Sequence, residues 1–182
     1  MGERVCVHGA AGGVGMAATQ LAAAAGARVV ATVRAEPLRE RLGQLVHGGG
    51  PAHVIAPQDF ESHGPYDVIL ELVGAPNLPG DLRALAMGGR IAVIGVGAGA
   101  KAEIHLLALM QARGRIHGST LRARPLEDKA HAARRIEREV LPLFGAGRLS
   151  VPIEASFSMR DAAQAYERFA QGGKLGKIVL EG

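Results

Sequence analysis

Short apolar runs rich in β-branched residues alternate with longer segments of helical composition along most of the chain. Each run has the length of a strand, and most intervening segments are long enough for a helix that crosses back over a sheet. The pattern predicts six strands, at Arg4–His8, Arg28–Val33, His53–Ile55, Tyr66–Val73, Arg90–Val96 and Arg115–Thr120.

Helical patterns fill most of the connections between these strands. The connection at Asp59–Pro65 contains few helix formers. A strand-helix-strand order of this kind predicts an α/β fold, a doubly wound parallel six-stranded sheet of the Rossmann type with helices on both faces. The expected helices are Val14–Ala25, Pro37–Leu45, Asn77–Met87, Glu103–Ala112 and Leu126–Phe144, with a loop at Gly48–Pro51.

The last 32 residues repeat the alternation on a smaller scale. A strand at Val151–Phe157, a helix at Met159–Ala170 with Ser158 as its cap, and a strand at Lys177–Leu180 are predicted. Such a tail need not join the first sheet. We therefore divide the chain into a dinucleotide-binding domain over residues 1–150 and a C-terminal strand-helix-strand tail over residues 151–182.

Composition narrows the classes of partner. Hydrophobic residues make up 48% of the chain, whereas aromatic residues make up 3% and Trp is absent, which disfavours stacking on nucleic-acid bases. No apolar stretch has the length of a membrane span, and the single cysteine, Cys6, excludes an intramolecular disulfide and a cysteine-rich metal site. We expect a cytoplasmic protein without metal, nucleic-acid partner or membrane segment.

The sequence HGAAGGVG at residues 8–15 directly follows the first strand and opens the first helix. Gly12 and Gly13 lack Cβ atoms, so their backbone N–H groups can approach a pyrophosphate at the start of the helix, beside Val14. Gly15 lets the helix pack closely on the strand. In this context the glycines indicate dinucleotide binding rather than tight packing alone, and no Gly-Lys-Ser/Thr follows that would make a P-loop.

The end of the second strand bears on the choice of nucleotide. NAD-binding proteins place an acid here to bind the ribose 2′-hydroxyl, but this chain has Val33 and Arg34, and Glu36 comes two residues late. The guanidinium of Arg34 can pair with a 2′-phosphate, which favours NADP(H), although an exposed loop arginine is the alternative. Arg39 on the following helix is expected on a solvated face.

Two further turns follow predicted strands at the same edge, Val73-Gly74 and Gly95-Val96. The carboxyl edge is where doubly wound sheets bind ligands, so these turns favour close approach to a cofactor over plain chain reversal. Side chains for the chemistry itself are not evident. His8 is expected to be a structural histidine rather than a base, and no Tyr-x-x-x-Lys pair, HExxH or G-x-S-x-G occurs. Catalytic residues stay unassigned.

These motifs resemble the cofactor-binding half of the medium-chain dehydrogenase/reductase superfamily, in particular its zinc-independent NADPH:quinone oxidoreductases. The resemblance implies that Gly12, Gly13 and Val14 bind the pyrophosphate. It also implies that Gly74, Gly95 and Val96 line the path of the ribose and nicotinamide, that Ser119, Thr120 and Leu121 lie near the carboxamide, and that Lys177 approaches from the tail. The stretches that carry the resemblance are VHGAAGGVG (7–15), GARVVATV (26–33), YDVILELVG (66–74), GGRIAVIGVGAGAKAEI (88–104), GSTLRARP (118–125) and LGKIVL (175–180).

The chain departs from this family in three places. Leu38 stands where the family often has a phosphate-binding lysine, and Ala56-Pro57 where it often has Asn-Tyr, which leaves Arg34 with more of the cofactor contacts. The family's N-terminal GroES-like domain has no counterpart before the first strand. The tail is therefore expected to belong to an incomplete catalytic domain, to leave Tyr166, Phe169, Ile178 and Leu180 partly exposed, and the chain to show little activity alone.

The resemblance thus predicts the cofactor-binding domain of an NADPH-dependent oxidoreductase that passes a hydride to a quinone or enone acceptor. A non-catalytic NADP(H)-binding module or redox sensor is the alternative, and an S-adenosylmethionine-dependent methyltransferase is disfavoured by the complete glycine loop. The family typically pairs through the edge strand that corresponds to Arg115–Thr120, so a homodimer through that edge is expected.

Overall fold

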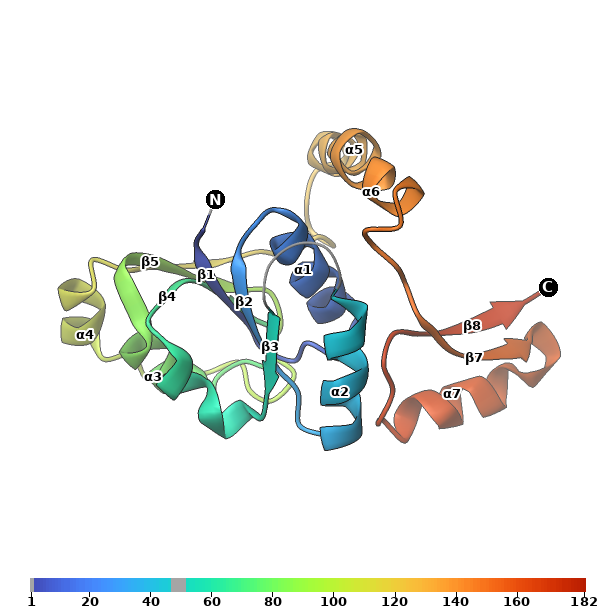
Figure 1. The fold of residues 1–182 in the computed structure, drawn as a ribbon, viewed down its shortest axis with the longest axis horizontal. Helices are drawn as coiled ribbons and strands as arrows, with labels where there is room; N and C mark the ends of the chain where they lie inside the picture. The colour runs from blue at the N-terminus through green and yellow to red at the C-terminus, as the bar shows by residue number, and fades with distance from the viewer. Residues whose placement is uncertain (1, 47–51) are drawn as a thin grey trace.

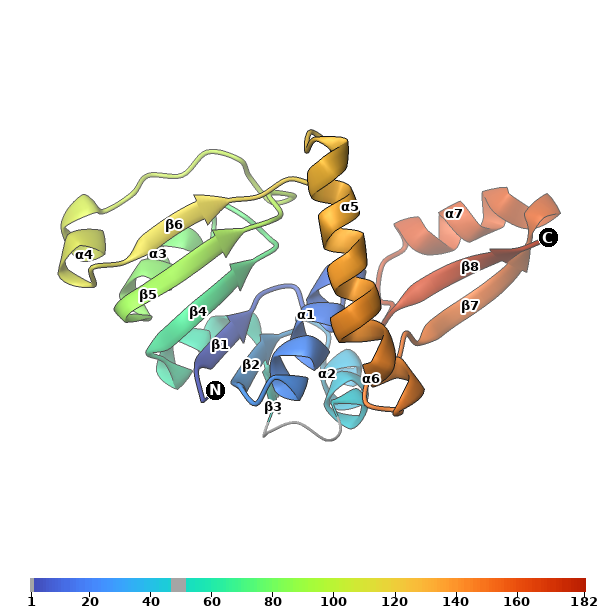
Figure 2. The same ribbon diagram turned by 90° about the horizontal axis from the view of Figure 1, so that it is seen from above.

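The computed structural model describes residues 2–46 and 52–182, so the loop expected at residues 48–51 lies outside the described residues. Six strands form one parallel sheet in the order β3-β2-β1-β4-β5-β6, which confirms the predicted doubly wound fold (Figures 1 and 2). The strands are β1 (Arg4–Val7), β2 (Arg28–Thr32), β3 (Ala52–Ile55), β4 (Tyr66–Glu71), β5 (Leu85–Val93) and β6 (Arg115–Gly118).

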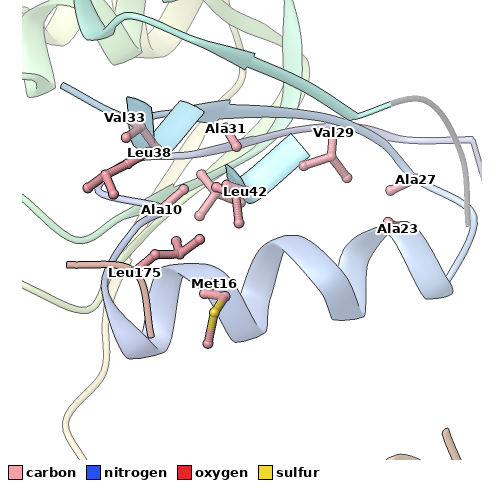
Figure 3. Close-up of a cluster of buried hydrophobic side chains, with 11 residues drawn as sticks. Ala10, Met16, Ala23, Ala27, Val29, Ala31, Val33, Leu38, Leu42 and Leu175 are labelled. Carbon is pink, nitrogen blue, oxygen red and sulfur yellow. The ribbon is translucent and has the colours of Figure 1, made fainter. Parts of the chain in front are cut away.

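Alternate residues of the central strands enter two separate cores, one on each face of the sheet. On β2, Val29 and Ala31 belong to one core, whereas Val30 belongs to the other. The first core also contains Met16 of α1 (Gly13–Ala24) and Leu42 of α2 (Glu36–Leu45), and in Figure 3 Leu42 lies between α1 and these strands. The period-two pattern of the sequence therefore specifies both faces of the sheet.

The second core lies under α3 (Leu78–Arg83) and a 3₁₀ helix at Pro57–His63, which occupies the connection that contains few helix formers. Phe60 from the 3₁₀ helix packs near Tyr66, whose hydroxyl donates to the Phe60 carbonyl at 2.6 Å. This bond satisfies a polar group that is fully buried.

The helix predicted over Asn77–Met87 is too long. It ends at Arg83, because β5 already begins at Leu85. Gly88 and Gly89, which directly follow the predicted helix, lie within β5. Gly88 adopts φ +75° and its N–H donates to the Ala112 carbonyl at 2.7 Å, where the register of β5 with β4 shifts.

The next two helices also differ from the predicted ranges. α4 spans Leu106–Gln111 rather than starting at Glu103, because His105 caps it by accepting the N–H of Ala108 at 3.0 Å. The long helix expected over 126–144 consists of α5 (Leu126–Arg135), a π turn at Ile136–Val140 and α6 (Leu141–Gly145). Pro142 lacks an N–H, so the α-helical bond to the carbonyl of residue 138 cannot form. No helix of the described chain is long and apolar enough to cross a bilayer.

The tail forms its own strand-helix-strand unit beside the main sheet (Figure 1). β7 (Ile153–Ser158) and β8 (Lys177–Glu181) pair in parallel, and α7 (Ala162–Ala170) connects them. Tyr166 and Phe169 on α7 are exposed, as the family resemblance implies.

Buried contacts tie the tail to the main domain. Leu175 is buried in the first core with Leu42 and Met16. The side-chain amide of Gln20 on α1 donates to the Ser150 carbonyl at 3.0 Å and accepts the Ser150 N–H at 2.9 Å. Although its sheet is separate, the tail is therefore packed against the residues that form the main core.

Replacing Leu175 by alanine is expected to lower the free energy of unfolding by about 2–5 kcal/mol, because a large buried side chain leaves a cavity in the core. Leu175 is 1% exposed, whereas Leu126 on α5 is 76% exposed and provides a matched control. The same change at Leu126 should shift stability by no more than about 0.5 kcal/mol. Urea unfolding followed by circular dichroism measures both, and equal losses would contradict the packing of the tail on the core.

Candidate functional site

A cleft of about 660 Å³ opens at the carboxyl edge of the main sheet, where the strand order reverses between β2-β1 and β4. We refer to it as the switch-point cleft. Ligands of doubly wound sheets bind at this position. Its lining comes from the turns after β1, β2, β4 and β5, from Pro57 and from the tail: Gly9, Ala11, Gly12, Thr32, Val33, Arg34, Ala35, Leu38, Leu72, Val73, Asn77, Gly97, Ala98, Gly172, Gly173 and Lys174.

The glycine loop forms the floor of this cleft. Gly9 adopts φ +62°, and the N–H of Gly12 donates back to the Gly9 carbonyl at 3.1 Å, which closes a tight turn directly before α1. Gly12 is the residue before the helix, and no side chain caps it. The first N–H groups of α1, including that of Val14, therefore lack intrahelical partners and are available to an anion.

Close packing between two backbone segments leaves room only for glycine at position 15. A Cβ atom at this position would lie 2.6 Å from the Gly9 carbonyl oxygen and 2.7 Å from the Ala10 Cα. At Gly13, by contrast, a Cβ atom would meet only the Lys177 side chain, 2.5 Å from its Nζ. Lys177 at the start of β8 thus places its ammonium group beside the glycine loop.

The turn after β2 presents a second cationic group. Arg34 lines the cleft with its side chain exposed. Arg39 does not simply lie on a solvated helix face. Its guanidinium donates to the carbonyls of Val33 at 3.2 Å and of Arg34 at 3.0 Å, and so fixes the conformation of the turn. Lys174, which the sequence did not single out, adds a second cation to the lining, and its ammonium nitrogen lies 4.4 Å from the centre of the Phe169 ring.

The turns after β4 and β5 pack on each other. Gly74 adopts φ +115°, and a Cβ atom there would lie 2.5 Å from the Gly99 carbonyl oxygen. A Cβ atom on Gly95 would lie 2.5 Å from the Leu72 carbonyl oxygen. Both glycines therefore serve contacts between the turns. Val73 lines the cleft, while Val96 is exposed next to the lining residue Gly97.

Ser119, Thr120 and Leu121 lie farther along the same edge, after β6, and are not among the lining residues of the switch-point cleft. The Ser119 N–H donates to the Val93 carbonyl at 3.0 Å, which extends the pairing of β5 with β6. Arg124 donates to the Ser119 hydroxyl at 2.8 Å and to the Thr120 carbonyl at 3.2 Å. The backbone of this segment is thus ordered beside the cleft rather than within it.

His8 is a structural histidine, as predicted. It is 1% exposed, its Nδ1 lies 3.2 Å from the Thr32 hydroxyl, and its Nε2 lies 2.9 Å from Asp81 Oδ1. The ring also packs edge-on against Phe60, with the ring centres 4.7 Å apart. Both ring nitrogens therefore have partners, and no face of the imidazole is open to a substrate.

Sequence reasoning did not identify Glu71 and Asp81, which lie beneath the cleft with His8. Glu71 accepts the N–H groups of Val73 and Gly74, the latter at 2.7 Å, and the side-chain amide of Asn77 at 3.0 Å. The available signal was an acid inside the apolar run VILELVG. Burial raises the pKa of the Asp81 carboxyl to about 6, with Glu71 adding to the shift and His8 opposing it.

The zinc-binding dehydrogenase family matches residues 50–180 of the chain. Over 98% of its length the chain is 36% identical to the spectinabilin polyketide synthase system protein NorB of Streptomyces orinoci and 31% identical to the quinone oxidoreductase of Mus musculus. Among solved structures, the quinone oxidoreductase of Thermus thermophilus, studied also in complex with NADPH, superposes with a TM-score of 0.82 at 29% identity, over 99% of this chain and 58% of that one.

The chain spans only part of these relatives. It corresponds to 8% of the polyketide synthase protein and to 55% of the mouse quinone oxidoreductase. The similarity therefore concerns a segment that occurs both within a far longer protein and within a protein about twice as long as this chain.

Gly15→Ala and Gly13→Ala are expected to change stability in opposite directions. At Gly15 the new methyl group collides with backbone atoms, which should lower the free energy of unfolding by about 1–3 kcal/mol. At Gly13 the flexible Lys177 side chain can move aside, and the lower entropy of the unfolded chain should leave stability unchanged or raise it by up to about 1 kcal/mol. Thermal unfolding of both variants tests this, and equal losses would contradict the described loop geometry.

Proposed function

Because the chain belongs to the zinc-binding dehydrogenase family, within the medium-chain dehydrogenase/reductase superfamily, we propose that it is the cofactor-binding domain of an NADPH-dependent oxidoreductase. The acceptor we propose is a quinone or an enone. The switch-point cleft carries this proposal, since it combines a glycine loop at a helix start with Arg34 and Lys174 in its lining. The names of the mouse and Thermus relatives support the quinone class.

The residues of the cleft fit a dinucleotide. Gly12, Gly13 and Val14 would bind the pyrophosphate through N–H groups that have no partner in the helix, with the Lys177 ammonium opposite. Gly15 keeps the loop close enough to the sheet for that contact. The bound cofactor supplies the hydride, and the protein contributes binding and orientation.

Preference for NADPH over NADH rests on the turn after β2. The chain lacks an acid at this point, and the Arg34 guanidinium suits the planar, bidentate recognition of a phosphate. Leu38, at the position where related enzymes often have lysine, is buried in the first core and offers no alternative contact. Arg39 supports Arg34 indirectly by fixing the carbonyls of the turn.

The nicotinamide end is proposed to lie along the turns after β4, β5 and β6. Val73 lines the cleft there, and the glycines at 74 and 95 let the two turns pack without bulky side chains. Val96 and the segment Ser119–Leu121 continue the same edge, where they would meet the nicotinamide and its carboxamide. None of these residues is a strong acid or base, which suits a hydride transfer that the cofactor itself drives.

A catalytic zinc does not fit the one cluster of potential ligands among the described residues, despite the family's name. In the described ranges, His8, Glu71 and Asp81 bring three potential ligands within 4.8 Å of one another. A catalytic zinc keeps an open position for water or substrate, whereas these side chains are fully buried and engaged with the protein. The chemistry proposed here therefore passes through no metal held by these three side chains.

We place the protein in a reducing compartment, the cytoplasm. Its single cysteine, Cys6, is buried in β1, and burial raises the pKa of the thiol. Such a thiol is unreactive and contributes packing rather than a disulfide.

Isothermal titration calorimetry of Arg34→Ala tests the cofactor assignment. Loss of a charge-assisted contact to the 2′-phosphate should weaken NADPH binding by about tenfold or more, while NADH binding changes by less than about twofold. Arg28→Ala, at the opposite end of β2, is the matched control and should bind both as the unaltered protein does. Tighter binding of NADH than NADPH by the unaltered protein would contradict the choice of cofactor, and no binding of either would contradict the proposed function.

A homodimer through the free edge of β6 is a further part of the proposal. Within the described sheet, β6 pairs with β5 on one side only, so its other backbone groups remain available to a second strand. The neighbouring α4 exposes Leu106, Leu107 and Met110, which a partner could cover (Figure 2). Size-exclusion chromatography with light scattering should give about twice the 18.9 kDa chain mass, and a monomer at every concentration would contradict the dimer.

A further inference from the structure

The described structure has a buried polar network directly beneath the switch-point cleft, formed by His8, Glu71 and Asp81. We propose that these three side chains are positioning residues for the cofactor, and that Asp81 and Glu71 share one proton whose presence keeps the cleft lining in its binding geometry. The inference rests on the proposed function, because it concerns how the same cleft binds NADPH.

The network contacts the cleft at three separate elements. His8 bonds the hydroxyl of Thr32 at the end of β2, and Glu71 accepts the N–H groups of the turn after β4. Glu71 also accepts from the side-chain amide of Asn77, immediately before α3. Thr32, Val73 and Asn77 all line the cleft. One buried cluster therefore fixes lining residues that are distant in sequence.

The hydrogen-bond inventory of this cluster favours a proton on Asp81. Both oxygens of Glu71 accept bonds, and Asp81 Oδ1 is paired with His8. Asp81 Oδ2 is buried and has no partner among the described residues. Glu71 and Asp81 are both buried, and keeping two buried carboxylates charged side by side carries a large free-energy cost. A proton on Asp81 Oδ2 removes the repulsion and provides a donor towards Glu71.

The other described side chains that face the cluster do not offset the negative charge of the two carboxylates. From β1, Cys6 lies 3.7 Å from His8 Nε2, and burial raises the pKa of its thiol. From β4, Tyr66 has a pKa raised mainly by burial and donates its hydroxyl to Phe60. Arg4 is directed to the carbonyls of His63 and Gly64. From β2 and the 3₁₀ helix, the uncharged Thr32 and Phe60 reach His8. Across the described ranges, no lysine or arginine side chain pairs with either of the two acids.

The shared proton makes cofactor binding depend on pH in a defined direction. The carboxyl of Asp81 has a pKa of about 6, raised first by burial. As pH rises through that value the proton leaves, Asp81 and Glu71 repel each other, and the acceptor of the Val73 and Gly74 N–H groups is displaced. Affinity is therefore highest when Asp81 is protonated, and it falls as pH rises.

The test compares NADPH affinity from pH 5.5 to 8 in the unaltered protein and in Asp81→Asn. The asparagine amide donates to Glu71 at every pH, so this variant should keep its affinity. Between the two pH limits the unaltered protein should lose about five- to tenfold more affinity than the variant. Titration of the cofactor's own phosphate is the same for both proteins and cancels in the comparison. Glu71→Gln removes the same repulsion and should also abolish the difference, which decides the matter if Asp81→Asn does not fold.

Asp67→Asn is the matched control, because Asp67 lies at the opposite end of β4 and accepts the N–H of Arg4 at 2.7 Å. It should follow the pH profile of the unaltered protein. Identical profiles for all the proteins would overturn the proton sharing while leaving the proposed function intact. About one zinc ion per purified chain, lost in Asp81→Asn, would overturn it too. If no protein binds NADPH or NADH at any pH, the proposed function and this inference both fail.

Discussion

The contact between α1 and the end of β1 is the constraint on which the rest of the molecule depends. Gly15 lies so close to Gly9 and Ala10 that no side chain fits between the two backbones. This close contact of the two backbones sets the start of α1 at the carboxyl edge of the sheet. It also positions the neighbouring Met16 in the first core. One packing requirement therefore provides both a stable βαβ unit and a row of N–H groups at the switch-point cleft.

The strands were predictable from sequence because each buried run is short, β-branched and bounded by turn residues. Helix lengths were less predictable, since local events shortened them. The cap by His105 makes α4 begin later than expected, and α3 ends early because β5 begins at Leu85. Gly12 and Arg34 could be assigned to the cleft from sequence because each lies in the turn that follows a predicted strand, and the parallel strands all end at the same edge of the sheet. Lys174 could not, because only the folding of the tail back onto Leu175 brings it there.

Glu71 and Asp81 show a different limit of sequence reasoning. Aspartate and glutamate side chains are usually exposed, so both acids would be expected at the surface from sequence alone. Only the sheet order, with β4 beside β1, brings both beneath the glycine loop and next to His8. Buried polar clusters of this kind depend on long-range pairing, so periodicity along the chain cannot predict them.

The tail contributes to the lining of the cleft together with the main domain. Gly172, Gly173 and Lys174 face the cleft, while the neighbouring Leu175 is anchored in the first core. A molecule seated in the cleft would touch both units and bind only while they are docked. By mass action, occupancy then stabilises the docked arrangement and slows amide hydrogen exchange in β8 and α7. The ligand would in this way act as a structural cross-link, which gives the small tail a stability that its own two strands cannot provide.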